Sequence, residues 1–342
     1  MIQRKEFVGA KEPTYYPYFD YLRGVAALGV FVGHADRYNY FPFLNNDACV
    51  QAFFALSGFL IGGILLRSKP DGLPRFFFNR AVRIWIPYAI AIALLGFGAI
   101  IRQGFDDAKL FEFLFYKATF VYNWFGPPQL AESIQRMPLA GTGNHFWSIC
   151  VEEQFYLVAP FLILFLPRAI LFACLAAATL LQPAYFASIS LGVILAITGP
   201  KIWIVAASAI IGLVFAITGP YIVAVSFSSM ALVGALARLP GRPTTISKIV
   251  GGASYSFYLN HWIGLFAISA AMEMGFPFWL AWLAGLGVAV SMSVAHYLFI
   301  DRAIAVRRDK WYSRRAGVLL FGLAVTLVAI GLAAGAFFYS PA

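Results

Sequence analysis

Charged residues are scarce in this chain of 342 residues: Asp, Glu, Lys and Arg together make up 12% of it. Soluble globular domains carry about 25% charged residues and about 45–50% apolar ones. Here 61% of the residues are hydrophobic, and many apolar runs approach the ~18–20 residues that span a bilayer. The composition therefore excludes a water-soluble enzyme. It predicts an all-α, polytopic bundle of membrane helices whose apolar surface faces lipid.

Cysteine and the common metal-binding and catalytic patterns are also rare or missing. The chain has three cysteines, Cys49, Cys150 and Cys174, and no Cys-x-x-Cys pattern. An odd number cannot complete a disulfide framework, and thiolate metal sites need paired cysteines. The sequence has no His-x-x-x-His pair, Gly-x-Ser-x-Gly elbow or Walker loop. We therefore expect no metal, and we expect the cysteines to act as small packing residues.

Positive charge, in contrast, is in excess, with 25 Lys and Arg against 15 Asp and Glu. If the N-terminus is cytoplasmic, 19 of the 25 cations fall in inner segments, as positive charge on the cytoplasmic side requires. This count favours the inner leaflet as the acidic neighbour and argues against nucleic acid. The first apolar run lacks a cleavage pattern and is interpreted as a membrane helix. In total the sequence predicts ten to eleven spans, near 20–37, 48–66, 82–101, 147–166, 168–182, 184–199, 201–217, 220–238, 250–272, 278–300 and 316–338.

The first span contains two ionisable side chains, Arg23 and His34, eleven residues apart. At 100° per residue they share one helix face, separated by roughly 16 Å along the axis. In the predicted orientation Arg23 lies near the inner end and His34 near the outer end. This pair would suit a long anionic donor, with a guanidinium below and a proton-accepting imidazole above. In the alternative, Arg23 reaches the inner interface beside Asp20, and His34 forms hydrogen bonds at the outer one.

The second span combines small residues with one hydroxyl group. Gly58 and Gly62 have the Gly-x-x-x-Gly spacing, and Gly29 and Gly33 repeat it in the first span. Such pairs let helix backbones approach closely, so we expect the first two spans to be in contact. Ser57 is either a nucleophile or, more commonly for such a serine, a donor to a neighbouring backbone carbonyl.

Arg80 and Arg83 follow the second span and are three residues apart, which makes them neighbours on a helix surface. Two guanidinium groups there could hold a phosphate bidentately. Anchoring at the cytoplasmic surface explains the same residues equally well.

The fourth and ninth spans carry further polar residues. Glu152 and Glu153 lie inside a predicted span, where a carboxylate needs a cation, a proton or water. We expect them at about the depth of His34, where a glutamate could orient the imidazole; in the alternative, Glu152 pairs with an arginine. In the ninth span, Ser254, Tyr258 and His261 recur at helical spacing and are expected to line a cavity. The long outer segment 102–146 is of a length typical of functional loops.

Together these segments resemble the membrane-bound acyltransferase-3 family, from Asp20 to about Asp301. The resemblance implies one acyltransferase-3-like domain over 1–342, with its core at about 15–305 and an extra helix at about 316–338. It rests on five ordered motifs: Arg23 with ten residues before His34; Phe53-Phe-Ala-Leu-Ser-Gly-Phe59; Arg80 with Arg83; Trp147-Ser-x-x-Val-Glu-Glu-Gln-Phe-Tyr156; and Tyr255-Ser-x-Tyr-Leu-x-His-Trp262.

The family resemblance also implies a function. Its members take acyl groups, usually acetyl, from cytoplasmic acyl-CoA and deliver them to a hydroxyl at the outer face, often on bacterial surface glycans. The expected location is therefore the bacterial inner membrane, with acyl-CoA, a glycan acceptor and the bilayer as partners. Asp301 is followed by Arg302, and the sequence shows no esterase-like domain after its last span; both depart from the usual pattern and leave the acceptor open.

Residue roles follow from the resemblance and the polar pattern together. Arg23, Arg80 and Arg83 are expected to hold the donor phosphates. His34 is expected to act on the acceptor hydroxyl as a base or through a covalent acyl-histidine, with Glu152 and Glu153 as catalytic partners. The expected substrate cavity consists of Ser57, Trp147, Ser148, Tyr156, Tyr255, Tyr258 and His261.

Two other classes of function remain open from the sequence. A transporter of a glycan or an anion could use the same polar residues as a substrate and proton pathway. A scaffold in an envelope complex would explain the apolar spans but would leave Arg23, His34 and Glu152 without a role.

Overall fold

The computed structural model describes residues 15–35, 46–103, 108–126 and 143–338, which form helices and no strands. A π-helical segment, Tyr297–Asp301, joins α12 to α13. The α-helices are α1 (Pro17–Ala35), α2 (Asn46–Leu65), α3 (Leu73–Gln103), α4 (Ala108–Ala118), α5 (Tyr122–Phe125), α6 (Trp147–Phe165), α7 (Arg168–Leu181), α8 (Pro183–Thr198), α9 (Ile202–Thr218), α10 (Tyr221–Arg238), α11 (Thr245–Glu273), α12 (Phe278–His296), α13 (Arg302–Trp311) and α14 (Arg314–Phe338).

A helix stands at each of the eleven predicted spans, which confirms the all-α polytopic fold. Within the described ranges, six helical segments are long and apolar enough to cross a membrane, and α7, α8 and α9 are shorter apolar helices. The outward side chains are apolar, such as Phe299 at 79% exposure and Ile217 at 77%. Such a surface is stable only against lipid.

The boundaries differ from the predictions where polar residues continue a helix. The third helix begins at Leu73 instead of residue 82, with Pro74 in its first turn, where proline favours helix initiation. Arg80 and Arg83 therefore lie on a helix. The predicted outer segment 102–146 includes α4 and α5. Residues 127–142 of this segment, with Arg136, lie outside the described residues, as does Arg37 between α1 and α2.

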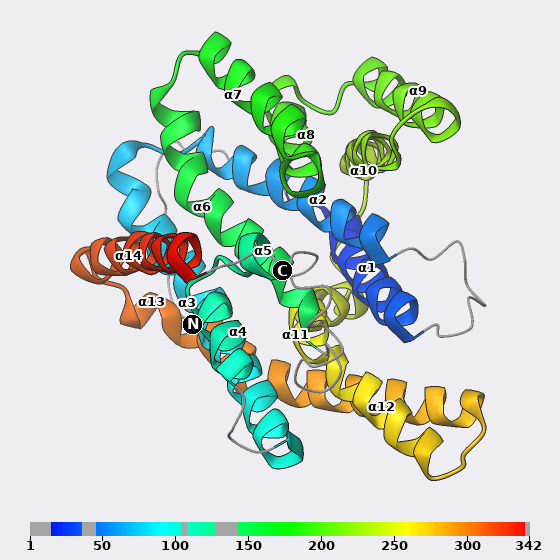
Figure 1. Ribbon diagram of the computed structural model, residues 1–342. Coiled ribbons are helices and arrows are strands. Elements are labelled where there is room, and N and C mark those ends of the chain that lie inside the picture. The colour runs from blue at the N-terminus through cyan, green and yellow to red at the C-terminus, as the bar shows by residue number, and fades with distance from the viewer. Residues whose placement is uncertain (1–14, 36–45, 104–107, 127–142, 339–342) are drawn as a thin grey trace, which may run out of the picture.

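Figure 1 shows the helices packed around α2, α6 and α11, with α7, α9, α12 and α14 toward the outside. The contacts are most extensive between α11 and α12, α2 and α8, α1 and α11, and α9 and α10. In Figure 1 the α9–α10 pair lies at one edge, α12 at another, and α14 beside α3. Residues of α1, α2, α3, α6 and α11 line one common cavity, which contains Arg23, Arg80, Arg83 and Glu152.

Helix ends that the charge count assigns to the same side of the membrane meet in the structure. On the predicted inner side, Arg75 forms an ion pair with Asp309 at 3.0 Å, although 234 residues separate them. On the predicted outer side, Gln51 donates a hydrogen bond to the Ala184 carbonyl at 2.8 Å. The alternation of inner and outer ends is therefore consistent with the contacts.

Small residues set the closest helix contacts, but not all with the expected partner. A Cβ on Gly29 would lie 2.5 Å from the Cys49 sulfur, so α1 and α2 do approach closely. The expected contact of the first two spans is therefore confirmed, whereas Gly58 and Gly62 contact another helix: a Cβ on Gly58 would meet the Ile189 carbonyl oxygen of α8 at 2.0 Å, and Gly62 faces α8 as well. The spacing predicts a close helix neighbour without specifying which helix supplies it.

Substitution of Gly192 by valine should destabilise the bundle. A Cβ there would lie 2.1 Å from the Ala55 backbone oxygen of α2, which cannot move without shifting the helix. Overpacking of this kind costs about 1–3 kcal/mol or more. We expect a lower thermal unfolding midpoint in detergent for Gly192→Val. Gly322→Val is the matched control, because a Cβ at Gly322 meets nothing within 4 Å, and an equal loss in both variants would contradict the packing argument.

Candidate active site

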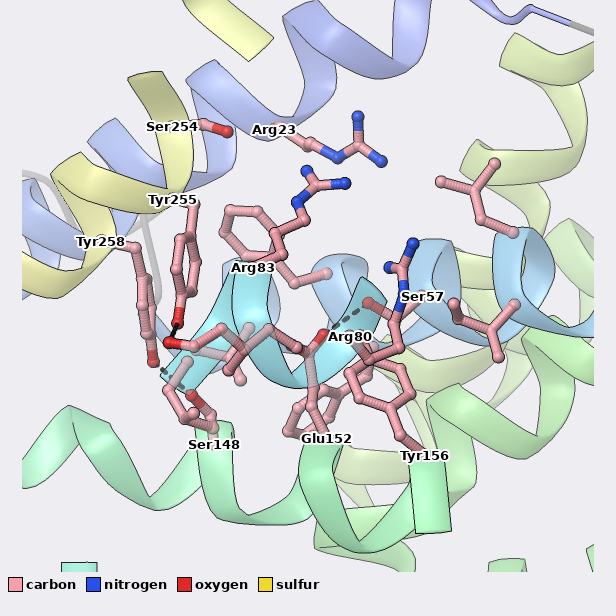
Figure 2. Close-up of a pocket in the computed structure, with 17 residues that line it drawn as sticks. Arg23, Ser57, Arg80, Arg83, Ser148, Glu152, Tyr156, Ser254, Tyr255 and Tyr258 are labelled. Carbon is pink, nitrogen blue, oxygen red and sulfur yellow. Dashed lines mark hydrogen bonds between the residues drawn. The ribbon is translucent and has the colours of Figure 1, made fainter. Parts of the chain in front are cut away.

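Five helices enclose one polar cavity of about 120 Å³ in the centre of the bundle (Figure 2). On α6 its residues are spaced four apart, at Ser148, Glu152 and Tyr156, so they share one helix face. Its polar and aromatic lining is Arg23, Phe53, Phe54, Ser57, Arg80, Arg83, Ser148, Glu152, Tyr156, Ser254, Tyr255 and Tyr258. All five sequence motifs therefore contribute to the cavity, the first of them through Arg23 alone.

Three guanidinium groups point into this cavity, Arg23 from α1 and Arg80 and Arg83 from α3 (Figure 2). Arg23 forms an ion pair with Asp20 of its own helix at 3.1 Å. Within the described residues, neither Arg80 nor Arg83 has a carboxylate within 4.0 Å, and the buried Nε of Arg80 has no hydrogen-bond partner. The three guanidinium groups outnumber the nearby carboxylates, Glu152 in the cavity and Asp20 on α1, and an excess of guanidinium groups favours an anionic ligand.

The two adjacent glutamates make different contacts, and neither contacts His34. Glu152 lines the cavity and accepts a hydrogen bond from Ser57. Glu153 is buried and accepts from the Trp85 indole at 3.0 Å. The expectation that Glu152 orients His34 is therefore wrong in its geometry. Glu152 lies eight residues into the helical segment that begins at Asn144, or ~12 Å below its outer end, too deep for His34 in the last turn of α1.

Ser148 and Tyr258 line the cavity next to the histidines. The hydroxyl groups of Ser148 and Tyr258 are 2.5 Å apart, and Tyr258 also donates to the backbone oxygen of His145 at 2.9 Å. Tyr255 donates to the Ile84 carbonyl at 3.2 Å. The rings of Tyr258 and His145 are in edge-on contact, with centroids 5.3 Å apart. Tyr258 therefore lies against a group of histidines.

The histidine group consists of His34, His145 and His261, three of the four histidines of the chain. The His34 Nδ1 and the His261 Nε2 are 3.1 Å apart. The His145 ring centroid lies 4.3 Å from that of His261 and 6.5 Å from that of His34. His145 and His261 are buried, whereas His34 is exposed. His34 is therefore the member of the group that an incoming molecule can reach.

Two predicted cavity residues lie elsewhere, and one important residue was missed. His261 belongs to the histidine group, and Trp147 packs against Phe54 with ring centroids 5.8 Å apart. Sequence reasoning did not select His145. It precedes α6 at the outer end, and counting residues from that end would have placed it, and not Glu152, at the depth of His34.

An adjoining pocket of about 270 Å³ continues from the cavity toward the predicted inner side. Arg83 and Tyr255 line both spaces. The inner pocket adds Tyr297, Asp301 and Arg308, and the Nε of Arg308 is buried without a hydrogen-bond partner. Asp301 accepts a hydrogen bond from Ser256 of α11. Arg308, which the sequence analysis did not select, brings a further guanidinium group to this end of the cavity.

Three histidines are a ligand set that zinc accepts, so the placement of such side chains decides whether a metal site exists. Within the described residues, no group of three His, Cys, Asp or Glu side chains could hold a metal ion. The three cysteines are free thiols.

One buried cation, Lys117 of α4, lies outside the membrane-spanning helices. Its side chain is 4% exposed, and its Nζ lies 3.6 Å from the centroid of the Tyr122 ring. Burial lowers the pKa of Lys117 from 10.5 to about 7. Its carbonyl oxygen accepts a hydrogen bond from Tyr88.

The stability of the protein should therefore rise with pH in a way that depends on Lys117. Between pH 7 and 10.5 the unfolded chain binds more protons at this amine than the folded one, so raising the pH through this window favours the folded state. We expect the unfolding midpoint of the wild type, relative to that of Lys117→Met, to increase from pH 7 to pH 9. A constant difference between the two proteins would contradict the shifted pKa.

The apolar helix bundle thus holds a cavity lined by three guanidinium groups, with the imidazole of His34 in the last turn of α1. Residues 16–200, more than half of the chain, match the acyltransferase-domain family. The chain belongs to this family, the membrane-bound acyltransferase-3 family.

Individual relatives agree with the family match. The chain is 30% identical over 165 residues to the O-acetyltransferase OatA of Staphylococcus aureus strain NCTC 8325, covering 45% of this chain and 26% of OatA. It is 27% identical over 168 residues to a protein of strain COL with a provisional O-acetyltransferase name, covering 47% of this chain and 26% of the relative. The chain thus spans about a quarter of the length of these relatives. No solved structure matches it.

Proposed function

We propose that this protein is a membrane O-acyltransferase that transfers an acyl group, acetyl in the first instance, from cytoplasmic acyl-CoA to a hydroxyl of a surface or exported glycan. The proposal places it in the bacterial inner membrane with its N-terminus in the cytoplasm. The observation that carries it is the cavity in which Arg80 and Arg83, without carboxylate partners among the described residues, join Arg23. Relatives named O-acetyltransferases support the reaction class.

The donor would enter from the inner side. Acyl-CoA carries phosphates at one end of a flexible arm and a thioester at the other, and guanidinium groups bind phosphates bidentately. The inner pocket, with Arg83 and Arg308, would receive the nucleotide end, and the central cavity would receive the arm. Arg23 and His34 lie eleven residues apart on α1, ~16 Å along the axis, so such an arm points from the arginines toward His34.

The acceptor would meet the donor at His34. In the direct form of the reaction, the imidazole takes the proton of the acceptor hydroxyl as that oxygen attacks the thioester carbonyl. The carbon–sulfur bond then breaks, and the thiolate takes the proton from the imidazolium, so that ester and CoA thiol are the products. In the covalent form, the bare imidazole nitrogen attacks the thioester carbonyl, and the carbon–sulfur bond breaks to release CoA thiolate. The acceptor hydroxyl then attacks the acyl-imidazolium, the acyl–nitrogen bond breaks, and the hydroxyl proton passes to the thiolate, so that ester and CoA thiol are again the products.

Ser148 and Tyr258 line the cavity next to the histidine group, so the donor arm would pass them on its way to His34. Glu152 lies among the arginines, where its carboxylate would limit the repulsion between them when no donor is bound. Its catalytic role, and that of Glu153, stays a prediction, as does the choice of acceptor.

Release of free CoA by the purified protein tests this proposal against a transporter. We expect acetyl-CoA and a polysaccharide acceptor together to yield free CoA and acetylated polysaccharide, and neither substrate alone to do so at the same rate. Flux of polysaccharide across proteoliposomes without CoA release would contradict the enzyme and favour the transporter.

A further inference from the structure

His34 and His261 are joined by a hydrogen bond whose geometry is close to linear. Their facing nitrogens, Nδ1 of His34 and Nε2 of His261, are 3.1 Å apart. The two ring planes are 4° from parallel, with centroids 5.3 Å apart. The distance between the ring centroids exceeds the distance between the two nitrogens by about the diameter of one imidazole ring. This is expected when the two rings lie end to end, with the nitrogens facing each other. One nitrogen must therefore donate and the other accept.

The other nitrogen of His261 decides which of the two donates. The His261 Nδ1 lies 2.7 Å from the backbone carbonyl oxygen of Tyr258, one turn earlier on α11. A carbonyl oxygen only accepts, so this nitrogen carries a proton. His261 is fully buried, and no carboxylate of the described residues forms an ion pair with it. A buried imidazolium without an anion is costly. In the neutral ring the Nε2 is then bare, and it accepts the proton of the His34 Nδ1.

The consequence for His34 is a fixed tautomer. With its Nδ1 protonated and bonded to His261, the neutral His34 ring has its lone pair on Nε2. Because His34 is exposed while its partner is buried, this nitrogen is the one that an incoming hydroxyl can reach.

We infer that His261 is the positioning residue of the acyl-transfer reaction: through the chain from the Tyr258 carbonyl to His261 to His34, it holds His34 as the Nδ1–H tautomer and presents Nε2 as the base. This inference rests on the proposed function for its catalytic meaning, although the tautomer itself does not. When Nε2 takes the acceptor proton, the imidazolium keeps its Nδ1–H bond to His261, so the ring does not turn between accepting the proton and releasing it to the departing thiolate.

Nitrogen-15 NMR of the full chain labelled in its four histidines, in detergent micelles at neutral pH, tests the tautomer without any substrate. The His34 signals are identified by their absence from His34→Gln. We expect a protonated Nδ1 and a bare Nε2 at His34 in the wild type, and loss of this preference in His261→Leu. A protonated Nε2 at His34 in the wild type, or an unchanged tautomer in His261→Leu, would overturn the inference.

Kinetics of three variants then test the role in catalysis. His261→Leu removes the acceptor and should lower kcat about 10²-fold or more, the range that general-base catalysis contributes, with the acetyl-CoA KM little changed. His261→Gln restores an acceptor oxygen and should recover at least a tenth of wild-type kcat. His296→Leu removes a buried imidazole of α12 that bonds Asn260 and does not contact His34, and should leave the His34 tautomer as in the wild type.

The failure of this inference is distinct from the failure of the proposed function. A wild-type protein that transfers acyl groups, and whose kcat survives in folded His261→Leu, contradicts the positioning role alone. A wild-type protein that transfers no acyl group contradicts the proposed function, while the NMR readout still decides the tautomer.

Discussion

His34→Ala should abolish acyl transfer while the protein still folds and binds its donor. The imidazole is the one member of the histidine group that is exposed, and on the proposed mechanism it handles the acceptor proton or carries the acyl group. Loss of a general base lowers kcat about 10²–10⁴-fold, and loss of a covalent carrier lowers it at least as much. The measurement is the rate of CoA release by purified protein with saturating acetyl-CoA and acceptor.

The control for this variant is His296→Ala. His296 lies on α12, neither in the cavity nor in the histidine group, and unlike His34 it is buried. We expect it to retain most of its activity, and both variants to elute as monodisperse protein. Full transfer by His34→Ala would remove the central residue of the mechanism.

Arg80→Gln combined with Arg83→Gln should raise the KM for acetyl-CoA by about 100-fold or more, with a much smaller effect on kcat. Hydrogen bonds to charged groups contribute about 1.5–3 kcal/mol each, and each 1.4 kcal/mol is about tenfold in affinity. Because these guanidinium groups would hold donor phosphates far from the reacting carbonyl, their loss removes binding in the ground state and the transition state alike.

Arg314→Gln separates this effect from general anchoring by inner-side charge. Arg314 is exposed at the start of α14 and does not line the cavity. If Arg80 and Arg83 act only as cytoplasmic anchors, the double variant and Arg314→Gln should behave alike, with normal donor KM and reduced membrane insertion. In the wild type, a dephospho-CoA thioester should have a lower KM than a thioester without phosphates. This difference in KM should be smaller in the double variant, because fewer guanidinium groups remain to bind the phosphates.

The fold was predictable because lipid imposes strong constraints on composition. Each apolar run became a helix, and ends assigned to one side by counting Lys and Arg, such as those with Arg75 and Asp309, meet in the structure. Helix partners were less predictable. Gly58 packs on α8 and not on α1, because a small residue permits a close approach from any neighbour.

The site was predictable where residues share one helix, and less so across helices. The helical repeat predicts that Arg23 and His34 share one face of the first helix. The resemblance to the family motifs predicts that the three arginines act together. The partner of His34 depends on how deep each side chain lies on a different helix. We predicted Glu152 at the depth of His34, near the outer surface, but it bonds Ser57. The residues found beside His34 are His145 and His261.

The central claim is transfer across the bundle, from a donor on the arginine side to an acceptor on the His34 side. Proteoliposomes with uniformly oriented protein, acetyl-CoA labelled in its acetyl group on the N-terminal side and polysaccharide on the other, test it by mass spectrometry of the polysaccharide. We expect labelled O-acetyl esters on the polysaccharide with wild-type protein and none with His34→Ala. Labelled esters in equal amount from both proteins, or none from the wild type while CoA thioester stays intact, would contradict it.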